Sequence, residues 1–488
     1  MSVVLVAGIL IGYFLILILI SFITSKGRNE QTFFNANKQS PWYVVAYGMI
    51  GASLSGITFI SVPGLVGDSQ FSYFQVVLGY QLGYLFIATV LMPVYYKYNL
   101  ISIYSYLNDR FGNFSHKTGS LFFILSRVIG AAFRLFLVAS VLQLALFDSL
   151  NLPFSITVLV TILLILIYTF RSGIKTIVYT DTLQTTMMLV AVIITVFSIA
   201  QKLNIENWQI FSTVANSQYS KIFFFNFKGE NGFLKQFFGG AFIAIVMTGL
   251  DQDMMQKNLT CKNLKEAQKN MLWFSIGLIP VNLIFLSLGA LLYIFAFEAG
   301  MAIPERPDML YPVIALNHLT TGAGIVFLLG IIAAAYSSAD SALTSLTTAF
   351  CIDFLGHDKN RNKNIKRTYV HIGFSVILFF VIMLFRYLNN DSIINNLFKA
   401  AGYTYGPLLG LFMFGLYTKR KIKDRVVPLI AFLSPVLAYI INFYSEEILW
   451  GYKFNFEILI LNGFITFLGL FFISSRGNPS FPVQNNEV

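Results

Sequence analysis

Charged residues are scarce in this chain. Asp, Glu, Lys and Arg make up 11% of the 488 residues, whereas hydrophobic residues make up 56%. Soluble domains carry about 25% charged residues. The mean hydropathy of +0.71 points the same way. One water-soluble core cannot hide this much apolar surface, so we predict an all-α integral membrane protein.

Residues suited to metal or redox chemistry are also few. The two cysteines, Cys261 and Cys351, cannot build a disulfide framework. The four histidines form no zinc-binding pattern such as H-E-x-x-H. No predicted span carries a histidine at its middle, so a nucleophile–base pair inside the membrane has no support either. We therefore do not expect an enzyme.

Long apolar runs occupy most of the chain. Thirteen of them approach the roughly 20 residues that a helix needs to cross the hydrocarbon core. They cover residues 3–24, 42–66, 71–96, 118–147, 153–170, 176–200, 236–254, 270–297, 322–352, 368–387, 392–417, 426–444 and 454–474. The first run is longer than the apolar part of a signal peptide, so we interpret it as a retained helix.

The net charge of +11 follows from membrane topology. If the N-terminus lies outside and the spans alternate, most of the 33 Lys and Arg residues fall on the inner side. Cytoplasmic loops of membrane proteins carry such an excess. A nucleic-acid partner is therefore not needed to explain the charge. We expect a multi-pass protein of the cell (inner) membrane, embedded in the lipid bilayer, with a cytoplasmic C-terminus.

Five ionisable residues fall inside predicted spans. They are Arg127, Arg134, Asp181, Asp340 and Lys399. Such residues are costly in a membrane, so each is a candidate for function. The alternative is a structural ion pair between helices.

The ninth span carries a stripe of hydroxyl groups. Ala334, Ser337, Ser338 and Ser341 share one helical face, and Ser337, Asp340, Ser341 and Thr344 form an overlapping stripe. Oxygen ligands with one carboxylate suit a hard monovalent cation. Close helix packing explains the small residues as well, but it does not explain Asp340.

The second span is rich in helix breakers. Residues 48–64 contain five glycines or prolines and four serines or threonines. We predict an interrupted helix, because unwound backbone at membrane depth lines a cavity and offers carbonyl groups to sodium. The alternative is a kink at Pro63.

Four further motifs follow one another along the chain. Residues 104–112 read YSYLNDRFG, residues 173–184 end in YTDTLQ, residues 251–256 read DQDMMQ and residues 406–411 read GPLLGL. Together they resemble the sodium:solute symporter family, over about residues 5–475. The resemblance implies a sodium-coupled carrier that brings a small polar solute into the cell by alternating access.

The resemblance also implies a fold. It predicts one transmembrane domain over residues 1–488 with a LeuT-type core of two inverted five-helix repeats and discontinuous helices. The core would span about residues 42–417, after an extra helix at 3–24 and before two C-terminal helices at 426–474.

Two sodium sites follow from the resemblance, for one or two coupling ions. The main site would use carbonyl groups of Gly51, Leu54 and Ala334 and the hydroxyl groups of Ser337 and Ser338. A second site, as in sialic acid carriers, would use Asp181, Ser337, Asp340 and Ser341. The relative has a serine at the Asp340 position, so a carboxylate here would tighten sodium binding or admit a proton.

The resemblance also implies the solute contacts, because Ser53, Ser55, Thr58, Gln81 and Arg134 fall where the sialic acid carrier contacts its ligand. Arg134 could hold a carboxylate by two hydrogen bonds, which favours an anionic sugar such as sialic acid or another carboxylate. Ala244 and Met247 stand where the galactose carrier has its sugar-binding amide and stacking tyrosine. The remaining alternatives are a neutral-sugar or amino-acid symporter, a channel, and a sensor built on a transporter fold.

Overall fold

A computed structural model describes residues 3–24, 36–100, 102–169, 174–226, 229–356, 364–388 and 393–476. Gly173, at the start of one family motif, lies outside these residues. Helices make up almost all of the described chain. The two strands it contains, β1 (Lys421–Ile422) and β2 (Ser474–Ser475), form a short antiparallel pair.

The helices fall into two halves along the chain. The first half contains α1 (Val3–Thr24), α3 (Trp42–Ser53), α4 (Gly56–Ser69), α5 (Tyr73–Phe86), α6 (Met92–Lys97), α7 (Ser105–Arg110), α8 (Asn113–Leu142), α9 (Phe154–Thr169) and α10 (Ile174–Lys202). The second contains α11 (Ile210–Ala215), α12 (Phe233–Ala244), α13 (Gln252–Asn258), α14 (Leu264–Glu298), α15 (Leu310–Asn317), α16 (Thr321–Ala349), α17 (Asn364–Leu388), α18 (Ile393–Thr404), α19 (Gly406–Tyr417), α20 (Val427–Phe443), α21 (Ser445–Ile448) and α22 (Ile458–Phe472). One π-helical turn, η6 (Ile245–Gly249), extends α12.

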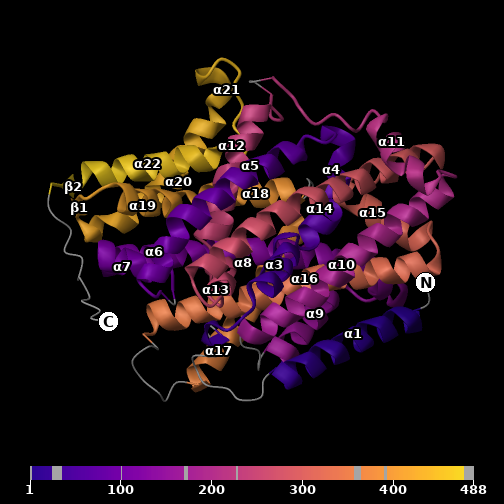
Figure 1. Ribbon diagram of the computed structural model, residues 1–488, viewed down its shortest axis with the longest axis horizontal. Helices are drawn as coiled ribbons and strands as arrows, with labels where there is room; N and C mark the ends of the chain where they lie inside the picture. Colours follow the sequence, from indigo (N-terminus) through magenta and orange to yellow (C-terminus); the bar gives the residue numbers. More distant parts are fainter. Residues whose placement is uncertain are drawn as a thin grey trace.

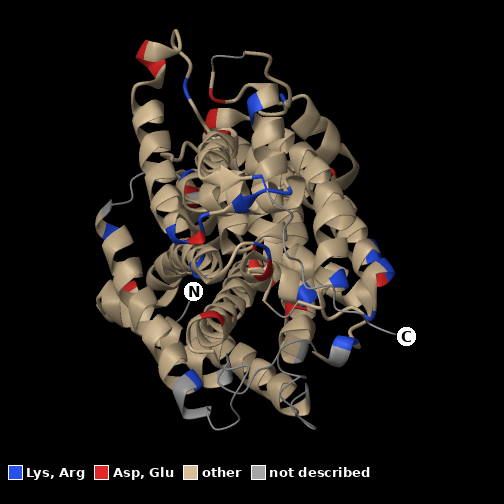
Figure 2. Cartoon of the chain, turned by 90° about the vertical axis from the view of Figure 1, so that its left-hand side faces the viewer, with Lys and Arg blue, Asp and Glu red and all other residues tan. Residues whose placement is uncertain are grey.

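Eight helices of the described chain are long and apolar enough to cross a membrane, or up to ten if each of two bent pairs counts as one span. Three shorter apolar helices cover Phe154–Ile167, Gly406–Tyr417 and Ile458–Phe472. Each of the thirteen predicted runs overlaps one of these segments. Figure 2 shows how little of the chain carries charge.

The second predicted span is interrupted, as its sequence predicts. Helices α3 and α4 meet at an angle of 55°. The break lies at Leu54 (ψ 36°) and Ser55 (ψ 173°), whereas Pro63 continues inside α4. The alternative of a kink at Pro63 is therefore wrong. The backbone leaves the helix at Leu54 and Ser55, directly before Gly56, where α4 begins.

A second bent pair lies in the seventh predicted span. The helix that runs from Phe233 to Gly249 and helix α13 meet at 71°. Asp251 sits at the junction in an extended conformation, and its side chain accepts hydrogen bonds from the backbone amides of Asp253 and Met254. The two breaks thus stand five spans apart, as an inverted repeat of five helices requires.

Helix α16 occupies the interior of the bundle (Figure 1). All its residues from Gly330 to Ala349 are buried, and it packs against α3, α4, α8, α10 and α13. Helix α1 lies at the edge. Small residues bring the central helices close. A methyl group added at Gly51 would lie 2.0 Å from Thr185 Oγ1, and one at Gly48 would lie 3.2 Å from Asp181 Cβ on α10.

Candidate functional site

The break between α3 and α4 exposes backbone oxygens. Among the described residues no hydrogen-bond donor reaches the carbonyl oxygens of Gly51 and Leu54, because the amides of Ser55 and Thr58 do not complete the helical pattern. Buried carbonyl groups without a donor are costly unless a cation or water takes the place of one. Both residues were predicted to hold the main sodium ion.

Helix α16 brings its hydroxyl groups to this break. A methyl group added at Gly56 would lie 3.8 Å from the Cα atom of Ala335. The Ser338 hydroxyl donates to the Ala334 carbonyl at 3.3 Å, and the Ser337 hydroxyl donates to Asp181 Oδ1 at 2.6 Å. The five residues predicted to hold the main sodium ion lie on α3, at the break and on α16, and their oxygens are of the kind that sodium prefers.

Asp181 has a second partner that the sequence did not reveal. Lys257 Nζ lies 2.8 Å from Asp181 Oδ2, and each side chain is 1% exposed. Lys257 follows the seventh predicted span, where the alternating topology predicts a cytoplasmic loop, but it belongs to α13 and is buried. Both oxygens of Asp181 are thus engaged, one by Ser337 and one by Lys257.

Asp340 lies on the same side of α16. Its Oδ1 accepts from the backbone amide of Ser341 at 2.5 Å, and its carboxylate interacts electrostatically with Lys257 and with Tyr13 of α1. The hydroxyl of Ser341 has no hydrogen-bond partner within the described chain. The second sodium site on these residues stays a prediction, with a lysine close to it.

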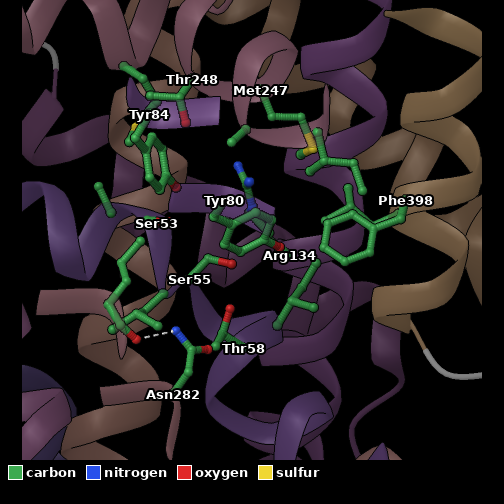
Figure 3. A pocket seen from close by; sticks show the side chains of 18 of the residues that line it. Ser53, Ser55, Thr58, Tyr80, Tyr84, Arg134, Met247, Thr248, Asn282 and Phe398 are labelled. Atoms are coloured by element: carbon green, nitrogen blue, oxygen red, sulfur yellow. Dashed lines mark hydrogen bonds between the residues drawn. The ribbon is translucent and has the colours of Figure 1, made fainter. Parts of the chain in front are cut away.

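A pocket opens beside the break and encloses about 720 Å³ of empty space, part of it continuous with solvent. Three predicted contacts, Ser53, Ser55 and Thr58, line it from α3 and α4. Tyr80 and Phe398 line it from α5 and α18. Figure 3 shows these side chains pointing into a shared space.

Arg134 of α8 reaches into this pocket beside Tyr80 (Figure 3). It is 9% exposed and makes no ion pair with the described residues, and its Nε lacks a hydrogen-bond partner there. Arg127, about two turns earlier, is bound by Asp253 and lies 3.6 Å from Asp251. Asp181, the other acidic residue of a predicted span that could have paired with Arg134, binds Lys257 instead.

Two other predicted residues lie elsewhere. The Gln81 amide donates to the Ser275 carbonyl at 3.1 Å, and Gln81 is not among the residues that line the pocket. Lys399 is exposed on α18.

The sequence reasoning did not select Tyr80, Tyr84, Asn282 or Phe398, all of which line the pocket. Tyrosine, phenylalanine and asparagine inside apolar spans look like ordinary packing residues, so only the assembled fold identifies them.

One family motif, at residues 104–112, stabilises the end of a helix. Arg110 donates to the carbonyl oxygens of Gly415, Thr418 and Arg420, which end α19. A guanidinium group is favourable there because free carbonyl groups carry negative charge at the C-terminus of a helix. This arginine therefore acts on the fold rather than on a solute.

Known proteins resemble this chain over most of its length. It matches the model of the sodium:solute symporter family over residues 33–424. It is 24% identical to the sodium/sialic acid symporter NanT of Aliivibrio fischeri over 433 residues, or 85% of this chain and 83% of that protein. It is also 24% identical to the sodium/sialic acid symporter SiaT of Proteus mirabilis, with 88% of each chain covered.

Solved structures share the fold. A substrate-bound, outward-open sodium-coupled sialic acid symporter superposes with a TM-score of 0.79 at 20% identity, with 96% of each chain covered. The nucleobase-cation-symport-1 transporter Mhp1 superposes with a TM-score of 0.57 at 15% identity, with 90% of this chain and 94% of that one covered. The paired helix breaks, the donor set between α3 and α16 and the match over residues 33–424 all agree: this chain belongs to the sodium:solute symporter family and is a sodium-coupled membrane transporter.

Proposed function

We propose that this chain couples sodium entry to the uptake of a small solute that carries a carboxylate, and that Arg134 binds the carboxylate. Sialic acid is the first solute to test, because relatives from Aliivibrio fischeri and Proteus mirabilis bear the name of sialic acid symporters. Sodium would bind at the five main-site residues. The N-terminus would lie outside and the C-terminus in the cytoplasm.

The observation that carries the proposal is that Arg134 is buried in the pocket without an ion-pair partner among the described residues. Its guanidinium group is buried in the pocket, and no carboxylate of the described chain forms an ion pair with it. An isolated buried charge is expensive, so a site keeps one only where a ligand of opposite charge compensates it. A carboxylate matches the planar fork of arginine with two parallel hydrogen bonds.

The helix break provides the coupling between ion and solute. Leu54 offers its carbonyl group to sodium, while its neighbours Ser53 and Ser55 line the solute pocket. A sodium ion that orders the backbone at Leu54 therefore also orders the two serines that face the solute. Each ligand then binds better when the other is present, as reciprocal linkage demands.

Uptake into proteoliposomes tests the proposal. We expect uptake of a sialic acid or another monocarboxylate that depends on an inward sodium gradient, with little uptake of galactose or of neutral amino acids. A preference for a neutral solute would contradict the anionic assignment. Absence of sodium-driven uptake for every solute, with a ligand still bound by the purified protein, would favour a sensor on this fold.

Arg134→Gln tests the residue itself. Loss of a charge-assisted pair costs about 1.5–3 kcal/mol, so the KM for the anionic solute should rise about 10- to 150-fold. Arg134→Lys keeps the positive charge but loses the planar guanidinium fork, so its KM should lie between the KM values of the wild type and of Arg134→Gln. Normal KM in Arg134→Gln would show that the arginine does not read the solute.

A further inference from the structure

Lys257 places a positive charge where the sequence leads us to expect a second sodium ion. Its Nζ lies 2.8 Å from Asp181 Oδ2, and both side chains are buried among α10, α13 and α16. Within the described residues Lys257 makes no other ion pair. It reaches this place because the 71° bend before α13 turns that short helix into the bundle.

Two of the four residues of the predicted second site, Asp181 and Asp340, already have partners. In the predicted second site the carboxylate of Asp181 binds sodium. In the structure its Oδ1 accepts a hydrogen bond from Ser337 and its Oδ2 faces Lys257. Asp340 Oδ1 accepts from the amide of Ser341. A sodium ion would have to displace the ammonium group to gain the carboxylate of Asp181.

The local charge leads to the same conclusion. Asp340 lies about one turn after Ser337 on α16, and the Ser337 hydroxyl donates to Asp181, so both carboxylates lie on one side of this helix. Asp253, one turn before Lys257 on α13, is paired with Arg127, so Asp181, Asp340 and Lys257 together leave a single negative charge. One sodium ion at the main site, beside Ser337, neutralises it, whereas a second ion would meet the positive charge of Lys257 at short range.

We propose that the ammonium group of Lys257 fills the second cation position between Asp181 and Asp340, so that this chain binds and carries one sodium ion per solute. The inference rests on the proposed function for its transport readout, but not for its binding readout. It makes Lys257 the residue that sets the coupling ratio. The extra carboxylate of Asp340 then serves to hold the lysine.

Sodium binding to the purified full-length protein is the direct test. We expect one ²²Na⁺ ion per chain for the wild type and two for Lys257→Gln, because that change frees Asp181 Oδ2 and removes the competing charge. The double variant Lys257→Gln/Asp340→Asn should return to one ion. Lys235→Gln is the matched control, because Lys235 is a buried lysine of α12 that lies against Glu457 and outside the cluster.

Equilibrium accumulation in proteoliposomes gives an independent measure. With a tenfold sodium gradient and the membrane potential held at zero, one ion supports about tenfold accumulation and two support about 100-fold. We expect about tenfold for the wild type and about 100-fold for Lys257→Gln.

Two bound ions or about 100-fold accumulation in the wild type would overturn the inference, and so would a single ion in folded Lys257→Gln. The number of sodium ions bound by the wild type tests the inference even if Lys257→Gln does not fold. Failure of every solute to be taken up would count against the proposed function, while the number of bound sodium ions would still test the role of Lys257.

Discussion

The hydroxyl of Ser337 serves two partners at once. It donates its hydrogen to Asp181 at 2.6 Å, so its lone pairs remain free to face a cation beside the broken helix. Asp181 is fixed in turn by Lys257. A chain of three side chains from α13, α10 and α16 therefore orients Ser337, a proposed sodium ligand, and geometry set in this way costs little when an ion binds.

Replacing Ser337 and Ser338 together by alanine should raise the sodium concentration for half-maximal uptake by at least about tenfold, because two of five ligands disappear. Sodium-dependent uptake at graded sodium concentrations measures this effect. Ser345→Ala, about two turns later on α16, removes a buried hydroxyl that donates to the Ala342 carbonyl and should leave the sodium dependence unchanged. Unaltered sodium dependence in the double variant would refute the main-site assignment.

Gly51 is required by the contact between α3 and α10. A methyl group there would lie 2.0 Å from Thr185 Oγ1 and 2.9 Å from Thr185 Cβ. Gly51→Ala should lower stability by about 1–3 kcal/mol, the usual cost of overpacking, as measured by thermal unfolding in detergent. Thr185→Ala should restore part of the loss.

Gly373→Ala is the control for this change, because nothing lies within 4 Å of its added methyl group. Equal stability of Gly51→Ala and Gly373→Ala would show that α3 and α10 have room to separate.

At the scale of elements, helix α8 depends on a cap from a distant loop. Asp424, just before α20, accepts hydrogen bonds from the backbone amides of Phe114 and Ser115 and from the Ser115 hydroxyl. These amides begin α8, where a negative charge is favourable. The same helix carries Arg127 and Arg134 toward the pocket.

Asp424→Ala should therefore destabilise the protein by about 0.5–2 kcal/mol, the usual cost of a lost helix cap. Asp424→Asn keeps an acceptor oxygen and should lose less. Thermal unfolding of the three proteins in the same detergent provides the comparison. Equal unfolding temperatures for all three would mean that α8 does not need this cap.

The order and type of the elements could be predicted from sequence because membrane helices are long and apolar. The break at Leu54–Ser55 was also predictable, since glycines and serines crowd the span. The position of Lys257 was not. It follows a polar stretch, Asp251–Gln256, that has the composition of a cytoplasmic loop, and its partner Asp181 belongs to a helix far away in sequence.

The residues of the solute pocket also divide into those that the sequence predicted and those that it did not. Arg134 and the serines beside the break were found, because charge and hydroxyl groups stand out against an apolar background. Tyr80, Asn282 and Phe398 were not found, since their types are common in any span and only packing brings four helices together around them.

The distribution of Lys and Arg over the loops predicts how the whole molecule is oriented in the membrane. The loop near Trp208 should face outside and the loop near Lys423 should face the cytoplasm. Both residues are exposed, while the native Cys261 and Cys351 are buried. A membrane-impermeant maleimide should label Trp208→Cys in intact cells and Lys423→Cys only after permeabilisation. The reverse pattern would invert the topology.

The tight seam at Gly48 and Gly51 also constrains how the transporter moves. Gly48 and Gly51 allow α3 to lie close against α10, and the ion pair between Asp181 and Lys257 joins α10 to α13. One half of each broken span is therefore in contact with α10. We expect α3, α10 and α13 to move together when the transporter opens and closes, with rotation at Leu54–Ser55 and Leu250–Asp251. The ion pair should keep α10 and α13 in contact during this movement.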